Sequence, residues 1–458
     1  MMTFSISQVL GAGLTLLFIA AVGIRAGRKI KNAKDFTIGG GKAAFYMVAG
    51  SIIGTLVGGS STIATSQLAF TNGFSALWFT LGAGIGCLIL GLFFAKPLRS
   101  SGSLTLQQVI RSEYGESAGL LSSIFGIIGI FLNIIAQLLS AMALLSTILP
   151  IPDLACAFIV AALMVCYVVF GGMHGASAIG VIKTVLLYAC SIVCVAVVLG
   201  KCGSFSALHA ALPQGQSFGL FSRGLGVDGG AALSLVLGVL STQSYAQSVL
   251  SAKSDRAAVA GSLASAVLIP PIGIASVLVG LYMRAAFPAS QAAQSFPQFL
   301  LSYFPGFWAG VFLATLLVAI IGCGAGLTLG IASIMTGNIY TRIRPGASDR
   351  QKLTVNRITI VAVLLLAIVF TVGDVQSVIL QWSFMSMGLR GAVVFIPLCG
   401  ALFLKGRIAP KYAIASVLAG PILVLAGKLL MKGLPFDPLF LGIFANVLIM
   451  AFGIRRRT

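Results

Sequence analysis

Long stretches without a charged side chain are the feature that most restricts how this chain can fold. None of the 35 residues from Gly306 to Tyr340 is charged, and about 20 apolar residues of helix suffice to cross the hydrocarbon core of a bilayer. Only 8% of the 458 residues are charged, whereas a soluble domain carries about 25%. Lipid leaves backbone polar groups no partner except within a helix or a closed barrel. The sequence therefore predicts an all-α polytopic membrane protein.

About thirteen membrane spans are predicted from the apolar runs. They lie near residues 7–24, 43–71, 75–95, 117–149, 154–172, 178–200, 226–250, 259–284, 306–340, 354–373, 377–404, 409–430 and 438–454.

The basic residues are distributed unevenly between the two sets of loops. With the N-terminus outside, 22 of the 29 Lys and Arg residues fall on one side and five on the other. Cytoplasmic loops carry the excess of Lys and Arg, so we expect an outside N-terminus and a cytoplasmic C-terminus. This topology accounts for the net charge of +20 without nucleic acid. We expect a multi-pass protein of the plasma membrane, a bacterial cytoplasmic membrane in particular, that works as a monomer in lipid.

Two predicted spans are interrupted by glycines and polar residues, Gly54–Ile63 in the second and Ser241–Ser248 in the seventh. Each interrupted span opens a group of five spans, which divides the chain into regions. These are 1–42 (an extra helix and a basic cytoplasmic loop), 43–200 (first repeat), 201–225 (external loop), 226–404 (second repeat) and 405–458 (two C-terminal helices and a basic tail). Interrupted helices at matching positions of two repeats point to a transporter whose site lies near the midplane.

Other classes of protein have less support. All nine acidic residues lie in loops or near span ends, and the two histidines show no metal spacing. No phosphate-binding loop of the Gly-x-x-x-x-Gly-Lys-Ser/Thr type is present. We therefore expect neither an enzyme nor a metal or cofactor site, and a passive channel or a membrane-embedded sensor is the alternative class.

Several short motifs occur in the order of a known family. They are Phe170-Gly171-Gly172 at the end of one span, Gln243 and Gln247 followed by Leu250–Ser254, Ile334–Tyr340, Gly73 and Lys96–Arg99. From about Lys42 to Lys411 the chain resembles the solute:sodium symporter family. The resemblance implies a five-plus-five inverted-repeat (LeuT-like) fold, with one helix before the repeats and two after them.

The family's sodium site, carried over by position, is altered in this chain. Carbonyls of Gly54 and Val57 supply two ligands, and three more positions fall at Ala319, Gly322 and Cys323. The family has paired Ser/Thr hydroxyls there, whereas a thiol is a poor ligand for a hard cation. The family's aspartate position falls at Gly180, and a family glutamine position falls at Lys183.

Lys183 has three alternative interpretations. Its ammonium group would satisfy the carbonyls of Gly54 and Val57 in place of sodium, as a fixed surrogate cation or as a proton carrier that titrates during the cycle. It would otherwise extend to the cytoplasmic edge of the membrane, or contact the substrate. The first interpretation predicts uptake that is indifferent to the removal of external sodium.

Arg390 is the second basic residue within a span, more than 20 Å of helix from the nearest loop marker on either side. An arginine in this position recognises a carboxylate or phosphate, or is held by carbonyls of a broken helix. By family position Ser61 and Thr242 face the substrate and Tyr245 gates the inner exit. Further polar candidates for the substrate site are Ser60, Gln243 and Trp382.

The sequence thus predicts a secondary transporter of a small organic solute, carboxylate-bearing or zwitterionic, that works by alternating access. We expect altered cation coupling, either sodium-independent or linked to H⁺. An ordinary Na⁺-coupled symporter with a rearranged sodium site is the alternative.

Overall fold

The computed structural model describes residues 5–27, 41–149, 151–212, 218–371, 378–430 and 434–454, and it leaves out the side chains of residues 24, 26–27, 169–176 and 429. Most of the predicted basic loop after the first helix lies outside these ranges, as do the tail residues Arg455–Arg457 and the acids Asp35 and Asp374. The side chains of the Phe170-Gly171-Gly172 motif are outside the description as well.

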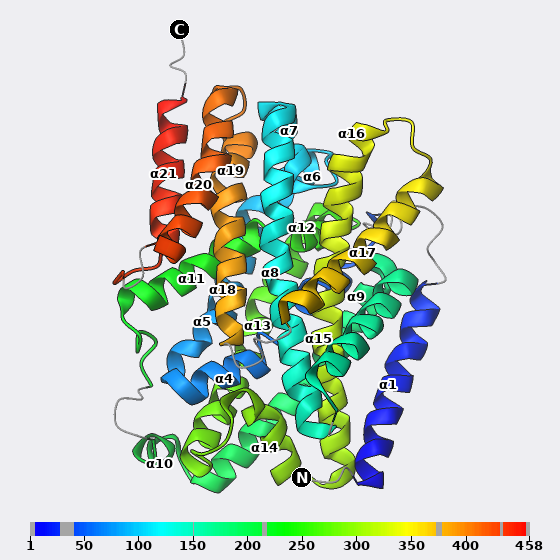
Figure 1. Ribbon diagram of the computed structural model, residues 1–458, viewed down its shortest axis with the longest axis vertical. Helices are drawn as coiled ribbons and strands as arrows, with labels where there is room; N and C mark the ends of the chain where they lie inside the picture. The colour runs from blue at the N-terminus through cyan, green and yellow to red at the C-terminus, as the bar shows by residue number, and fades with distance from the viewer. Residues whose placement is uncertain are drawn as a thin grey trace.

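The described residues form a bundle of helices (Figure 1). Long helices and helix pairs cover the predicted spans, with bounds α1 Ile6–Gly27, α3 Phe45–Leu56, α4 Ile63–Asn72, α5 Trp78–Ile89, α8 Glu116–Ile148, α9 Asp153–Cys202, α11 Leu225–Leu240, α12 Gln243–Leu250, α13 Asp255–Ala286, α15 Gly306–Ile334, α17 Asp349–Thr371, α18 Ile379–Arg390, α19 Ile396–Phe403, α20 Pro410–Leu430 and α21 Leu439–Phe452. Short helices lie between them: α6 Ala95–Ser100, α7 Leu106–Tyr114, α10 Phe205–Ala210, α14 Ser295–Tyr303 and α16 Thr341–Ile343.

Within the described ranges, nine helices are long and apolar enough to cross a membrane, or ten when the bent pair α11–α12 counts as one span. Three shorter apolar helices lie at Phe45–Leu56, Asp153–Val168 and Leu439–Phe452. The count of thirteen stays a prediction, because it depends on how the shorter helices and the breaks are combined.

One predicted boundary is not a break in the helix. We expected separate spans at 154–172 and 178–200, whereas the backbone is helical throughout α9, from Asp153 to Cys202. The glycines between the two segments lower helix propensity by only about 1 kcal/mol each, and no proline is present to end the helix.

The helices of the two predicted repeats pack in a reciprocal pattern. The first helix of each repeat contacts the second helix of the other, in the pairs α3–α13 and α11–α5. The third helix of each repeat contacts the last helix of the other, in the pairs α8–α18 and α15–α9, and the third helices α8 and α15 contact each other. Contacts that repeat in this way relate the two groups of five spans by an approximate two-fold symmetry.

The extra helices lie outside this core. In Figure 1, α1 packs along α15 and α9 on one flank, and α20 with α21 covers the opposite flank. The first helix begins at one end of the long axis and α21 finishes at the other end. This arrangement is the one that the predicted odd number of spans would produce, and which end faces the cytoplasm stays a prediction.

Candidate functional site

The second predicted span is broken between α3 and α4, and all residues of the break, 57–62, are buried. A helix end leaves its last carbonyls without partners inside the helix. Here each of the carbonyls from Gly54 to Val57 accepts a hydrogen bond from a side chain. The donors are Lys183 for Gly54 and Val57, Cys323 for Thr55, and Ser61 for Leu56. The interrupted backbone is therefore held by side chains rather than by helical hydrogen bonds.

Lys183 of α9 extends into this break, and only 1% of its surface is exposed. Its Nζ lies 2.6 Å from the carbonyl oxygen of Gly54, 2.7 Å from that of Val57 and 3.1 Å from that of Ala319 on α15. A lysine ammonium group has three N–H donors, so these three carbonyls satisfy it completely. Two of them, the carbonyls of Gly54 and Val57, lie at the C-terminal end of α3, which carries a partial negative charge.

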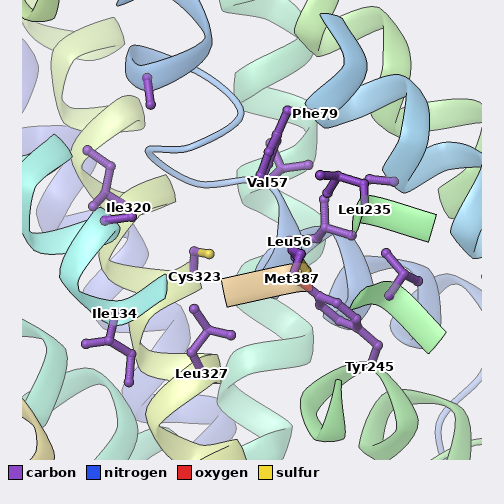
Figure 2. Close-up of a cluster of buried hydrophobic side chains, with 14 of the residues drawn as sticks. Leu56, Val57, Phe79, Ile134, Leu235, Tyr245, Ile320, Cys323, Leu327 and Met387 are labelled. Atoms are coloured by element: carbon purple, nitrogen blue, oxygen red, sulfur yellow. The ribbon is translucent and has the colours of Figure 1, made fainter. Parts of the chain in front are cut away.

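The side chains of α15 add no hydroxyl at this point. Ala319 contributes its carbonyl, and Cys323 donates its S–H to the Thr55 carbonyl. A Cβ atom built on Gly322 would lie 3.6 Å from Lys183 Nζ. Figure 2 shows Cys323 facing the end of α3, where Leu56 and Val57 lie, with Ile320 and Leu327 on either side along α15. The Cβ atom built on Gly322 would also lie 3.2 Å from the Tyr167 hydroxyl, so the ammonium group lies among backbone carbonyls with one tyrosine hydroxyl nearby.

Gly180, at the family's aspartate position, lies where α9 crosses α3. A Cβ atom at residue 180 would approach the Gly50 carbonyl oxygen to 2.1 Å. An aspartate therefore does not fit here while the helices keep this separation, and Gly180 contributes close packing.

The second broken span lies between α11 and α12, which meet at an angle of 44°. Arg390, fully buried on α18, contacts this break: Nη1 donates to Thr242 Oγ1 at 2.6 Å. Nε donates to the Ser386 carbonyl at 3.1 Å, and Nη2 donates to Ser386 Oγ at 2.9 Å and to Met387 Sδ at 3.1 Å. These contacts use four of the five N–H donors of a guanidinium group. Arg390 is therefore held mainly by its own helix and by one hydroxyl of the break.

No carboxylate lies within ion-pair distance of Lys183 or Arg390 in the ranges that the structure describes. Two other buried polar groups near the second break, the hydroxyls of Ser241 and Tyr245, have no hydrogen-bond partner among the described residues. In Figure 2 the Tyr245 ring lies next to Met387, the residue that accepts from Arg390. A break that has a buried cation in contact with Thr242 and two unpaired hydroxyls on the residues around it is suited to binding an anionic group.

A buried hydrogen-bond network surrounds Ser60, and the sequence analysis missed most of it. Ser60 Oγ lies 2.6 Å from Ser383 Oγ and accepts from Gln137 Nε2 at 2.8 Å. Gln137 Oε1 accepts from the Gly59 backbone N–H at 2.8 Å, and Ser383 donates to Asn133 Oδ1 at 3.2 Å. The available signal was the pair Asn133 and Gln137, one turn apart on an otherwise apolar helix.

Three other residues predicted to contact the substrate, Ser61, Gln243 and Trp382, lie in three different environments. Ser61 donates to the Leu56 carbonyl, and Gln243 binds the backbone of Leu104 and Leu106 at the start of α7. Trp382 is partly exposed and lines a cavity on another face of α18. The structure therefore brings Ser60, Thr242, Tyr245 and Arg390 to the two breaks. It directs the side chain of Gln243 from the second break to the start of α7, and it places Trp382 at a separate cavity.

Comparison with known proteins identifies the family. Residues 36–420 match the sodium:solute symporter family. A high-affinity choline transporter of Caenorhabditis elegans is 27% identical over 397 residues, which cover 80% of this chain and 68% of the relative.

Solved structures share the fold. A Na⁺-coupled sialic acid symporter in a substrate-bound, outward-open state matches with a TM-score of 0.83 at 18% identity, over 98% of this chain and 97% of the other. The nucleobase-cation-symport-1 family transporter Mhp1 in a closed conformation matches with a TM-score of 0.57 at 13% identity, over 92% and 94% of the two chains. These likenesses confirm the predicted all-helical, LeuT-like fold. Sodium is the ion in the names of the family and of the sialic acid symporter. The protein is a multi-pass membrane transporter of small solutes and not an enzyme, and it belongs to the sodium:solute symporter family.

Proposed function

We propose that this protein is a secondary transporter of a small carboxylate-bearing or zwitterionic solute, and that the Lys183 ammonium group takes the place of sodium. Transport proceeds by alternating access across the plasma membrane, with the monomer as the working unit. The observation that carries the proposal is the position of Lys183 Nζ, within 3.1 Å of three carbonyls from α3 and α15.

Saturation of the carbonyls by the ammonium group supports sodium independence. A second cation at the same point would be a like charge only a few ångströms from the ammonium group, and burial of this point away from water strengthens the repulsion. Gly322 and Cys323 supply no hydroxyl that favours sodium over the ammonium group. Sodium therefore has neither the space nor the ligands that it needs at this point.

Arg390 supports the choice of a carboxylate as the recognised group. The two relatives leave this choice open, because choline is a cation and sialic acid is a carboxylic acid. A buried guanidinium group with an unused donor favours an anion, and a carboxylate matches its planar geometry. The unpaired hydroxyls of Ser241 and Tyr245 are further donors at the same break.

Uptake into proteoliposomes tests the cation part of the proposal. A panel of radiolabelled small carboxylates and amino acids is screened, and transport of the hits is measured with sodium replaced by N-methyl-D-glucamine. We expect equal initial rates in the two media. Strict dependence on sodium would contradict the proposal and favour the alternative, a symporter with a rearranged sodium site. An imposed proton gradient then separates the two roles of Lys183, since it accelerates uptake only if the lysine carries protons.

Arg390→Lys and Arg390→Gln test the substrate part. Loss of a charge-assisted hydrogen bond costs about 1.5–3 kcal/mol, equivalent to about 10- to 100-fold in affinity. We expect this loss for carboxylates in both variants, since neither glutamine nor the shorter, non-planar lysine ammonium group places a charged N–H donor where the unused guanidinium donor lies. Unchanged affinity in both variants would remove Arg390 from the substrate site. Flux without saturation in the unmodified protein would instead favour a channel.

A further inference from the structure

The cavity that Trp382 lines is separate from the two breaks and lies at the start of α18. Its volume is about 450 Å³, and it is open on one side. Trp382 and Met385 of α18 line one wall. The other lining residues include Arg223 just before α11, Lys428 in the last turn of α20 and Asp437 just before α21. Volumes between about 300 and 1,000 Å³ are typical of pockets for small ligands. The cavity is therefore large enough for a small solute.

The charges around this cavity are balanced and partly fixed. Arg223 Nε donates to Asp228 Oδ1 at 2.7 Å, and the Asp228 side chain is fully buried. The Arg223 guanidinium group also lies over the ring of Phe384, 5.8 Å from the ring centroid. Asp228 and Phe384 therefore fix Arg223 in one orientation at the cavity wall.

Lys428 and Asp437 form a looser pair. Lys428 Nζ lies 3.9 Å from Asp437 Oδ2, while Asp437 Oδ1 accepts from the Leu439 backbone N–H at 2.9 Å. At this distance the pair is an ion pair without a hydrogen bond, so a ligand can enter between the two groups at low cost. With Arg223 and Asp228, the cavity carries two positive and two negative charges.

We propose that this cavity is a second solute site, which binds an amino-acid-like zwitterion with an apolar side chain. The ligand carboxylate faces Lys428 beside Arg223, its ammonium group faces Asp437 Oδ2, and its side chain lies against Trp382 and Met385. A zwitterion matches both members of the Lys428–Asp437 pair, whereas a singly charged ligand leaves one of them without its partner. The proposal goes beyond the transport function and gives α20 and α21, which lie outside the two repeats, a part in binding.

The position of the cavity on α18 separates it from the central polar groups. Ser383 and Ser386 face the network and Arg390, whereas Trp382 and Met385 face the cavity. Phe384 lies between these sets, with its ring edge-on to Phe79 at a centroid distance of 5.8 Å. A ligand in the cavity therefore contacts α18 without reaching Ser60.

Tryptophan fluorescence of the purified full-length protein in detergent tests the proposal with three probes of matched shape. L-leucine is the zwitterion, 4-methylpentanoate carries only its carboxylate, and 3-methylbutylamine carries only its amine. We expect saturable quenching by L-leucine alone. The quenching should disappear in Trp382→Phe, which removes the indole but keeps an apolar wall, and persist in Trp308→Phe, a control on the exposed residue Trp308.

Charge variants complete the test. Lys428→Gln should weaken L-leucine binding by about 10-fold or more, because it removes one charged partner of the carboxylate. Lys253→Gln, at an exposed lysine elsewhere, should leave binding unchanged. Quenching that survives Trp382→Phe, equal responses to all three probes, or no response at all would overturn the proposal. Because Arg390→Gln disables the central site but should leave this quenching intact, failure of the second site is distinguishable from failure of the proposed transport function.

Discussion

Lys183 and Arg390 lie on the helices that close the first and second groups of five spans, and each directs a buried cation at the broken helix that opens its own group. Lys183 reaches the end of α3 from α9, and Arg390 reaches Thr242 beside α12 from α18. The two cations differ in how they are satisfied. Lys183 has three carbonyls for three donors, whereas the contacts of Arg390 leave one N–H donor unused. This difference is why we assign the fixed charge to Lys183 and ligand recognition to Arg390.

Removal of the lysine side chain should convert the first break into a weak cation site. Lys183→Ala leaves the carbonyls of Gly54, Val57 and Ala319 without a donor, and each unsatisfied buried group costs about 1–3 kcal/mol. We expect uptake in sodium-free medium to fall by at least about 10-fold, with partial recovery when sodium is added. Lys405→Ala, at an exposed lysine outside the family motifs, is the matched control and should transport normally. If Lys183→Ala transports as well as the unmodified protein, the ammonium group has no role in the cycle.

Restoring the missing hydroxyls should strengthen that site. In the triple variant Lys183→Ala/Gly322→Ser/Cys323→Ser, two hydroxyl oxygens join the carbonyls, which gives sodium the oxygen ligands that a hard cation prefers. We expect sodium, but not potassium, to raise the thermal unfolding temperature and to stimulate uptake. The control Lys183→Ala/Gly322→Ala/Cys323→Ala has similar volume and no hydroxyls. An equal response to sodium in the two triple variants would exclude these hydroxyls as ligands.

The sequence was most informative about the features that composition and the order of motifs determine, namely the fold class and the position of the broken helices. Apolar runs predicted the helical class, and the paired interruptions near Gly54 and Ser241 indicated a transporter with two repeats. The five-plus-five fold followed from the resemblance to the symporter family. Lys183 was noticed because a charge within a span is rare and must find partners. The partners expected for it are the backbone carbonyls of Gly54 and Val57. Their position follows from the family's fold and does not depend on the side chains of these two residues.

Contacts between distant helices were not predictable in the same way. Nothing in a single sequence places Gln137 of α8 beside Ser60, 77 residues away, or turns Trp382 away from Arg390 on the same helix. We assigned Trp382 and Gln243 to the same site as Thr242 because we assumed that polar residues near a break have neighbouring side chains. Helix rotation decides which of them share a face, and it depends on packing against other helices.

Gln137 should prove important for the shape of the first break. Its amide accepts from the Gly59 N–H and donates to Ser60 Oγ, so Gln137→Leu leaves the buried Gly59 N–H unsatisfied and removes one of the hydrogen bonds of Ser60 Oγ, which keeps its bond to Ser383. We expect a loss of stability of about 2–4 kcal/mol and a marked fall in transport rate. Gln298→Leu on α14, where the side chain is only partly buried, is the control. Thermal unfolding and uptake measured on both variants check this, and equal stability of the two would show that the amide contacts contribute nothing.

Gly129 of α8 gives Arg390 the space that its aliphatic stem occupies. A Cβ atom at residue 129 would lie 2.5 Å from Arg390 Cγ, and the Gly129 carbonyl accepts a hydrogen bond from Ser386. Gly129→Ala should therefore displace the guanidinium group from Thr242 and cost about 1–3 kcal/mol of stability through overpacking. Gly200→Ala at the end of α9, where a Cβ atom meets nothing within 4 Å, is the control and should be neutral or slightly stabilising. The decisive measurement is selectivity, because displacement of Arg390 should weaken the affinity for carboxylates more than that for uncharged analogues. A variant that loses stability but keeps its preference for carboxylates would show that Arg390 packs against Gly129 without serving the substrate site.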